Sequence, residues 1–142
     1  TAPVELNSGE LEELGIQEME LVVYGYLPVM VSAGCVRKNT SGCTGKAGEL
    51  ILTDRQKKNM TVKNVCRYCY NVMYNTSPLL LADQQMKIMR LHPRALRLAF
   101  TTEDGENMQK ILCMFRNIYI ENTECSIPKM DYTRGHFKRG VK

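Results

Sequence analysis

Four cysteines in two polar segments restrict how this chain can fold more than any other feature of its sequence. Cys35 and Cys43 lie in the loop VSAGCVRKNTSGCTG, and Cys66 and Cys69 form a C-x2-C pair after 22 intervening residues. Polar loops are under little packing constraint, so paired cysteines in them need a chemical reason. If the four thiols share one partner, the two loops must meet in space.

The spacing C-x7-C-x22-C-x2-C leaves several chemistries open. A C-x2-C pair can present two thiolates to one metal from a tight turn, and four thiolates suit structural zinc or an iron–sulfur cluster. The x7 spacing is looser than that of a usual zinc-ribbon knuckle. A redox pair of the thioredoxin kind belongs to a different βαβ context, and unconnected thiols are common in intracellular proteins. Spacing alone does not decide between a metal site and free thiols.

The other two cysteines and the hydropathy of the chain bear on its compartment. Cys113 is expected beside the core on a helix, and Cys125 is expected to be incidental. Six cysteines without a secretion signal argue against a disulfide framework. No apolar stretch approaches the roughly 20 residues of a membrane span. We therefore expect a cytoplasmic protein with no membrane partner.

The apolar pattern predicts helices and strands in α/β order. A capping box at Asn7 and Glu10 begins a short helix. The run MELVVYG, residues 19–25, is typical of a buried strand. Further along the chain the pattern predicts an extended stretch at 27–32, a hairpin at 49–65, a mostly helical segment at 77–91, a strand at 94–100 and a long helix capped by Thr102. The apolar stripe of that helix is Met108, Ile111, Leu112, Phe115, Ile118 and Tyr119.

This order predicts an α/β fold with parallel strands and crossover helices, and a small antiparallel cysteine-containing insertion at about 33–76. The 142 residues have the size of a single domain. Two or three core strands are few for a self-contained sheet. We therefore expect the chain to be part of a larger barrel, with apolar edges that favour self-association.

The charge of +4 is concentrated in a basic tail. Residues 1–20 hold six acids and no Lys or Arg, whereas 126–142 hold five bases and one acid. Basic side chains in the tail can hold the phosphates of a polyanion, an aromatic ring can stack on a base, and a histidine can act as an acid or base. Alternatively the ring packs inward and the charges are simply solvated. The candidate residues are Arg134, Phe137, Lys138 and Arg139 for polyanion binding, and His136 as a catalytic candidate.

Several stretches of this sequence resemble one known family. VYGYLPVMVSAGC resembles the signature E-x-x-VYG-x-LP-x-M-x-S of the U32 peptidases, the collagenase-like proteases. Members of that family are longer, so the resemblance implies a C-terminal fragment whose partner is the missing N-terminal part of the same protein. The other matching stretches, in the family's order and covering nearly the whole chain, are PVELN, TDR at 53–55, VCRYCYNVMYN, RLAFTTE and TRGHFKRGV.

The resemblance implies a catalytic region of incomplete TIM-barrel type with its cysteines at the C-terminal face. Several relatives bind a 4Fe-4S cluster through four cysteines and hydroxylate RNA bases or a quinone precursor. Relatives of that group often carry a further cysteine soon after the second, where this chain has Lys46, Ala47 and Gly48. Cys69 would therefore be the fourth ligand. The candidate metal ligands are Cys35, Cys43, Cys66 and Cys69, with zinc as the alternative to the cluster.

Three functions follow as hypotheses. The family label implies a peptidase hydrolysing collagen-like or other peptides, but the sequence shows no recognisable nucleophile–base pair and no hydrolytic zinc motif. Four thiolates and a basic tail suit an iron–sulfur enzyme that modifies RNA. The third hypothesis is a non-catalytic structural or substrate-docking half. The catalytic residues stay unknown in each case, and we expect residues 1–142 alone to be inactive.

Overall fold

The protein is described here by a computed structural model that covers residues 1–123 and 125–140. The chain divides into two compact units, one made of Thr1–Gly25 with the segment from Pro78 onward, the other of Tyr26–Ser77. The predicted cysteine-containing insertion at 33–76 lies within the second unit. The last two residues of the predicted basic tail, 141–142, lie outside the described residues.

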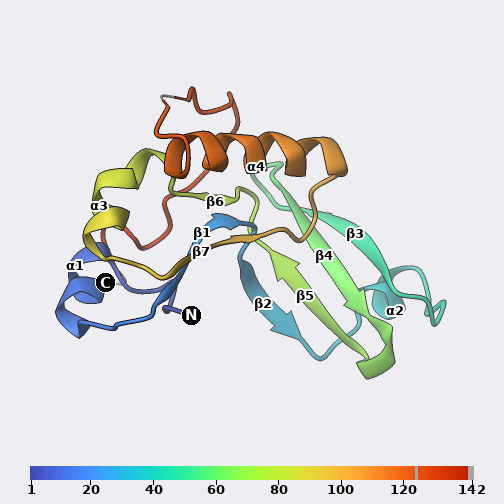
Figure 1. The fold of residues 1–142 in the computed structure, drawn as a ribbon. Coiled ribbons are helices and arrows are strands. Elements are labelled where there is room, and N and C mark those ends of the chain that lie inside the picture. Colours follow the sequence, from blue (N-terminus) through green and yellow to red (C-terminus); the bar gives the residue numbers. More distant parts are fainter. Residues whose placement is uncertain (124, 141–142) are drawn as a thin grey trace. The chain divides into compact units, whose positions relative to one another are not determined.

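The first unit is built on a three-stranded sheet of order β6-β1-β7 (Figure 1). The central strand β1 pairs parallel with β7 and antiparallel with β6. Its residues are buried from Leu21 to Gly25, as expected for a strand between two neighbours and covered on both faces. The predicted buried strand and the predicted parallel pairing are both confirmed. The strands are β1 (Glu20–Gly25), β6 (Leu79–Leu80) and β7 (Ala95–Ala99).

The capping box that begins helix α1 (Ser8–Leu14) is confirmed. The Asn7 side-chain oxygen accepts from the backbone N–H groups of Gly9 and Glu10 at 2.8 and 3.0 Å, and a Glu10 carboxylate oxygen accepts from the Asn7 N–H at 2.7 Å. Gly15 ends the helix with a left-handed φ of 56°. The backbone groups at both helix ends are thereby satisfied.

The long helix α4 (Gly105–Tyr119) begins two residues later than the sequence predicts. Asp104 is its N-cap, accepting from the Asn107 N–H at 2.8 Å, so the prediction of Thr102 is wrong. Asp caps a helix at least as well as Thr, so both residues were possible caps from the sequence. The backbone becomes helical only after Asp104, which makes Asp104 the cap. Figure 1 shows α4 running along the three strands of its own unit.

The buried face of α4 agrees with the predicted stripe at most positions. Ile111, Phe115 and Ile118 are buried, and so is Met114, which the prediction omitted. Leu112 is 48 % exposed, contrary to the prediction, because a helix rotates it away from the face that Ile111 and Phe115 bury. Cys113 is also exposed, so its placement beside the core is wrong.

The segment at 77–91 contains less helix than predicted. It begins with β6, continues as the 3₁₀ turn η2 (Ala82–Gln84) and ends as helix α3 (Gln85–Arg90). The backbone of Leu80 donates to the Thr133 carbonyl and that of Thr133 donates to the Pro78 carbonyl, each at 2.9 Å. A distant part of the chain thus holds the start of this segment extended, which a local pattern does not reveal.

The second unit is a four-stranded antiparallel sheet of order β2-β5-β4-β3 (Figure 1). The predicted hairpin at 49–65 is confirmed as β3 paired with β4. The stretch after it, which received no assignment from the sequence, forms β5 between β4 and β2. The elements are β2 (Pro28–Ser32), α2 (Val36–Thr40), β3 (Gly48–Thr53), β4 (Asn59–Val65), η1 (Cys66–Tyr68) and β5 (Tyr70–Tyr74).

The architecture as a whole confirms a mixed α/β protein. The described strands include one parallel pair, β1 with β7, and the other pairings between named strands are antiparallel. Within the described ranges, no helix has both the length and the apolar character needed to cross a membrane.

Candidate functional site

The register of the second unit's sheet brings its two cysteine loops to one end. Ser32 of β2 lies opposite Asn71 of β5, Asn71 lies opposite Asn64 of β4, and Asn64 lies opposite Gly48 of β3. These four residues form a row across the sheet. The chain between β2 and β3 leaves and re-enters at this row and carries Cys35 and Cys43.

The second cysteine loop leaves the sheet at the same row. It joins β4 to β5 and carries Cys66 and Cys69. Figure 1 shows α2 and the turn between β4 and β5 toward the same end of these strands. The fold therefore places all four predicted ligands in two loops at one end of one sheet, which hereafter is named the cysteine end.

Two hydrogen bonds tie these loops to their surroundings. The Cys66 thiol donates to the carbonyl oxygen of Lys46 at 3.0 Å, three residues beyond Cys43. The Asn71 side-chain amide donates to the Gly34 carbonyl at 2.6 Å, next to Cys35. One bond therefore joins the two cysteine loops to each other, and the other joins the first loop to β5.

The C-x2-C pair sits on a tight turn. η1 starts at Cys66, and the backbone N–H of Cys69 donates to the Cys66 carbonyl at 3.3 Å. Cys69 has a φ of 53°, a left-handed conformation that costs an L-residue about 1–2 kcal/mol. Strained non-glycine residues of this kind cluster at functional sites.

The described cysteines are all free thiols. Cys35 caps α2 and accepts from the Lys38 N–H at 3.5 Å, while Cys66 donates its proton to a carbonyl. Within the described residues no group of three or more His, Cys, Asp or Glu side chains is arranged to hold a metal ion. Convergence of the four sulfurs on one metal stays a prediction.

The two cysteine loops carry basic charge without acidic charge. Residues 33–47 contain Arg37, Lys38 and Lys46, and the C-x2-C turn contains Arg67, whereas neither stretch contains Asp or Glu. Positive charge of this kind offsets the charge of an anionic group bound nearby. The sequence analysis assigned basic character only to the C-terminal tail and missed these four residues, although their clustering is visible in the sequence.

An aromatic pair stands beside these bases. Tyr68 is 66 % exposed, and its ring stacks on Tyr70 with centroids 6.4 Å apart and planes at 21°. The Arg67 guanidinium lies 5.4 Å from the centroid of the Tyr68 ring. The cysteine end thus offers exposed aromatic surface next to positive charge.

A pair of buried asparagines lies across the strands at the cysteine end. Asn64 is 4 % exposed and Asn71 is fully buried. Both oxygens and the Asn64 amide nitrogen have no hydrogen-bond partner in the described structure, while the Asn71 nitrogen donates to Gly34. Buried amides without partners are uncommon in native proteins. The sequence analysis did not single out these residues.

Part of the basic tail is buried, whereas the polyanion-binding hypothesis requires exposed side chains. Phe137 is only 4 % exposed, and its carbonyl accepts from the Ser8 N–H at 2.9 Å. The prediction that Phe137 stacks on a base therefore needs correction, because the first unit's core already surrounds its ring. Lys138 and Arg139 are exposed, and their contact with a polyanion stays a prediction. His136 is exposed with its Nδ1 3.1 Å from the Gly140 carbonyl, and its catalytic role also stays a prediction.

Arg134 is engaged by an acidic side chain. Its guanidinium contacts one oxygen of Asp83 through Nε at 2.7 Å and through a terminal nitrogen at 2.5 Å. Partial burial alone would raise the pKa of Asp83, but hydrogen bonds from Arg134 and Gln84 and the charge of Arg134 hold that pKa below its ordinary value of 3.8. This ion pair ties the tail to η2.

We expect this ion pair to add acid-sensitive stability. Because the folded-state pKa of Asp83 is lowered, its contribution is full above the ordinary value of 3.8 and is lost as pH falls through the folded-state pKa. Asp83→Asn should cost at most about 1 kcal/mol at pH 7. The difference in unfolding free energy between wild type and variant should shrink as pH falls below about 4. Urea unfolding measured above and below this pH tests the prediction. Asp131→Asn, at an exposed aspartate, is the control. A difference between wild type and Asp83→Asn that does not change with pH would contradict the prediction.

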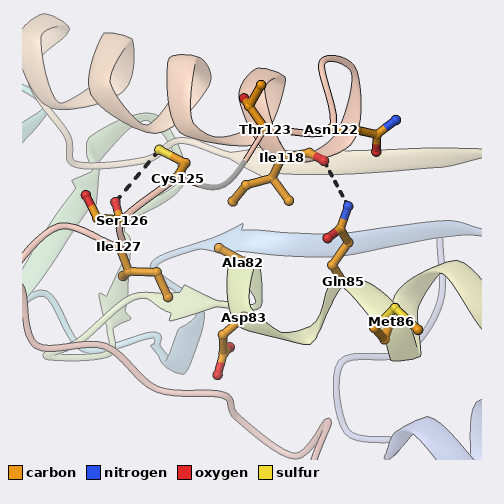
Figure 2. Close-up of a pocket in the computed structure, with 10 residues that line it drawn as sticks. All are labelled: Ala82, Asp83, Gln85, Met86, Ile118, Asn122, Thr123, Cys125, Ser126 and Ile127. Atoms are coloured by element: carbon orange, nitrogen blue, oxygen red, sulfur yellow. Dashed lines mark hydrogen bonds between the residues drawn. The ribbon is translucent and has the colours of Figure 1, made fainter.

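An open cleft of about 880 Å³ lies beside this ion pair in the first unit, between the start of α3 and the C-terminal part of α4 (Figure 2). The Gln85 amide donates to the Ile118 carbonyl at 2.9 Å across it. Its described ionisable residues are Asp83 and Cys125, and Asp83 is engaged by Arg134. Figure 2 shows Cys125 directed at the Ser126 carbonyl, 3.8 Å away. The cleft therefore offers no nucleophile–base pair among these residues.

Comparison with protein-family models, with curated proteins and with solved structures gave no match for this chain. Its function is therefore argued from the site.

Proposed function

We propose that this chain carries a four-cysteine iron–sulfur centre held by Cys35, Cys43, Cys66 and Cys69. The observation that supports the proposal is the sheet register, which brings both cysteine loops to one end of the sheet in the second unit. Two loops that leave the same end of a sheet can bring their four cysteines to a common partner.

The donor set fits this group. Four thiolates are the usual ligands of a 4Fe-4S cluster, and such a cluster supplies one-electron chemistry when bound. The four bases in the two loops offset the negative charge of four thiolates. In the thiol form Cys66 donates to the Lys46 carbonyl, a bond that a thiolate cannot make. Metal binding therefore requires the segment around Lys46 to release Cys66.

Metal analysis of the anaerobically purified chain tests the proposal. We expect roughly four iron and four sulfide per chain with broad absorbance near 400 nm, as for a 4Fe-4S protein. If the protein instead contains only zinc, at about one per chain, and is colourless, the centre is a structural zinc site and not a cluster. Substoichiometric metal after reconstitution with iron and sulfide, and with zinc, would overturn the proposal.

We further propose that the chain is a C-terminal part of a U32-like catalytic region, completed by a TIM-barrel-like sheet in a cytoplasmic protein. The parallel pair β1/β7 is compatible with such a sheet. Val29, Met30 and Val31 of the edge strand β2 are 56, 54 and 65 % exposed, which supports a covering partner or self-association. The peptidase activity implied by the family resemblance has no supporting side-chain geometry in the cleft.

RNA is the substrate class that the cysteine end favours over a peptide. Single-stranded nucleic acid is bound by basic grooves with aromatic rings on which bases stack. Tyr68 is exposed between Arg67 and Tyr70, and the two loops carry bases and no acids. This observation supports an iron–sulfur enzyme that acts on RNA. Lys138 and Arg139 of the first unit stay separate candidates for phosphate contact.

Removing the exposed ring should weaken RNA binding. Tyr68→Ala removes one stacking surface, so a labelled single-stranded RNA of about 15 nucleotides should bind about 5–100-fold more weakly. Tyr68→Phe keeps the ring and should bind like wild type. Arg55→Ala at the opposite end of the sheet controls for general charge. Fluorescence anisotropy measures all three, and equal affinity of Tyr68→Ala and wild type would exclude stacking at this position.

A further inference from the structure

Helices α1 and α3 of the first unit come together at their C-terminal ends. An open cleft of about 460 Å³ lies between them, and its lining residues come from 11–18 and 90–92. Figure 1 shows the two helices as neighbours on one side of the unit. The exposed side chains around this cleft are hereafter named the α1–α3 surface.

Four apolar side chains of the α1–α3 surface are exposed. Leu14 and Ile16 at the end of α1, and Met86 and Met89 on α3, have 44 to 73 % of their area exposed. The two methionines are three residues apart and so share one face of α3, while Ile88 between them is buried. Grouped apolar side chains on a surface mark an interaction site, and methionine adapts readily to such contacts.

The charges that the two helices contribute to this surface have opposite sign. Glu12 and Glu13 belong to α1, Lys87 and Arg90 belong to α3, and all four side chains are exposed. Within the described residues none of these four side chains forms an ion pair. The surface therefore presents two acids and two bases that the chain itself does not pair.

The position of the two acids adds a reason for an external cation. The C-terminal end of a helix carries partial negative charge, so carboxylates there are unfavourable and cations are favourable. Glu12 and Glu13 lie in the last turn of α1, which contains no basic residue. Bases supplied by a partner would relieve this repulsion.

A second copy of this chain matches both halves of the surface. In a two-fold symmetric pair the same patch of each copy meets itself, so a contact of α1 with the partner's α3 occurs twice. Acids then face bases at both contacts, and the apolar side chains pack between them. A partner of one charge sign would match only half of the surface.

We propose that the chain forms a two-fold dimer through the α1–α3 surface, with Glu12 and Glu13 of each copy facing the bases Lys87 and Arg90 of the other. This interface is distinct from the edge strand β2, and the proposal does not depend on the iron–sulfur centre. Because two short helices make a small interface, the dimer should be weak and should dissociate on dilution.

Charge reversal in separate chains tests the dimer. Analytical ultracentrifugation should show wild type passing from monomer to dimer as its concentration rises, with a reducing agent present because the described cysteines are free thiols. Glu12→Lys combined with Glu13→Lys should raise the dimer dissociation constant at least about 10-fold, because like charges then face each other. Lys87→Glu combined with Arg90→Glu should do the same.

An equal mixture of these two double variants is the decisive sample. One chain then carries bases on both helices and the other carries acids on both, so opposite charges again face each other at both contacts. The mixture should dimerise with an affinity close to that of wild type, although each variant alone does not.

Two further variants complete the test. Lys57→Glu combined with Lys58→Glu changes the net charge as much as the α3 variant does, but at exposed positions of the second unit. This control should dimerise like wild type. Met89→Gln removes an exposed apolar side chain without changing the charge and should weaken the dimer. It also serves if a charge variant fails to fold, which circular dichroism would show.

The outcomes separate this dimer from other kinds of association. Dimerisation of wild type, its loss in each double variant and its recovery in the mixture support the proposal. A wild-type chain that stays monomeric at the highest concentration would overturn it, and so would a mixture that stays monomeric. Dimers that persist in both double variants would place the contact elsewhere, and wild-type species that grow beyond the dimer would exclude a closed two-fold pair.

Discussion

Replacing any one of Cys35, Cys43, Cys66 or Cys69 with serine should reduce iron retention to a small fraction of that of the wild-type chain. A serine hydroxyl is a harder and less acidic ligand than a thiol and does not match the thiolates that iron–sulfur clusters require. If the metal is zinc, a binding free energy of about 10–16 kcal/mol shared by four ligands is about 3 kcal/mol per ligand. Loss of one ligand should then weaken zinc affinity roughly 100-fold.

The matched control for these variants is Cys113→Ser. Cys113 is exposed on α4 in the first unit, so its replacement should leave iron content and absorbance unchanged. Iron and sulfide assays after anaerobic reconstitution measure the effect. If one of the four serine variants retained full iron and an unaltered spectrum, that cysteine would not be a ligand, and the four-cysteine assignment would fail.

Gly25→Ala should be the most destabilising small substitution in the first unit. Gly25 ends β1 with a φ of 143°, and a Cβ placed there would lie 2.2 Å from the carbonyl oxygen of Ala99 in β7. A strained backbone costs about 1–3 kcal/mol and overpacking about 1–3 kcal/mol. Together they predict a loss of about 2–6 kcal/mol, because the parallel pair β1/β7 must separate.

Gly15→Ala separates the clash from the backbone conformation. Gly15 also has a positive φ, of 56°, but a Cβ there would meet nothing within 4 Å. The expected cost is about 1–2 kcal/mol, from the left-handed conformation alone. Urea unfolding followed by circular dichroism compares the two variants. Equal destabilisation of both would contradict close contact between Gly25 and β7.

Much of the fold could be predicted where the signal is local. The Asn7 capping box, the apolar run of β1 and the hairpin β3/β4 each depend on residues that are neighbours in the sequence. β6 could not be predicted in this way, since Leu80 is held extended by Thr133, 53 residues later. The strand β5 escaped assignment because Val72 and Met73 are its only aliphatic residues, too few for a clear apolar pattern.

The candidate site was predictable in part for the same reason. The four cysteines stand out by residue type, and their position in two loops at one sheet end follows from strand pairing that the sequence left unassigned. The asparagine pair could not be found, because its significance lies in burial without partners, and burial depends on tertiary packing. For Phe137 the sequence left stacking on a base and inward packing as alternatives, because its neighbours are charged while its ring is apolar, and the burial of the ring favours inward packing.

Alkylation of the loaded protein tests most directly whether the four cysteines hold one group. Iodoacetamide treatment under nitrogen, followed by peptide mass spectrometry, reports which thiols the metal shields. We expect Cys35, Cys43, Cys66 and Cys69 to be protected together in the iron-loaded chain and modified in the metal-free chain, with exposed Cys113 modified in both. Equal labelling of the four cysteines with and without bound iron would contradict a shared centre at this end of the sheet.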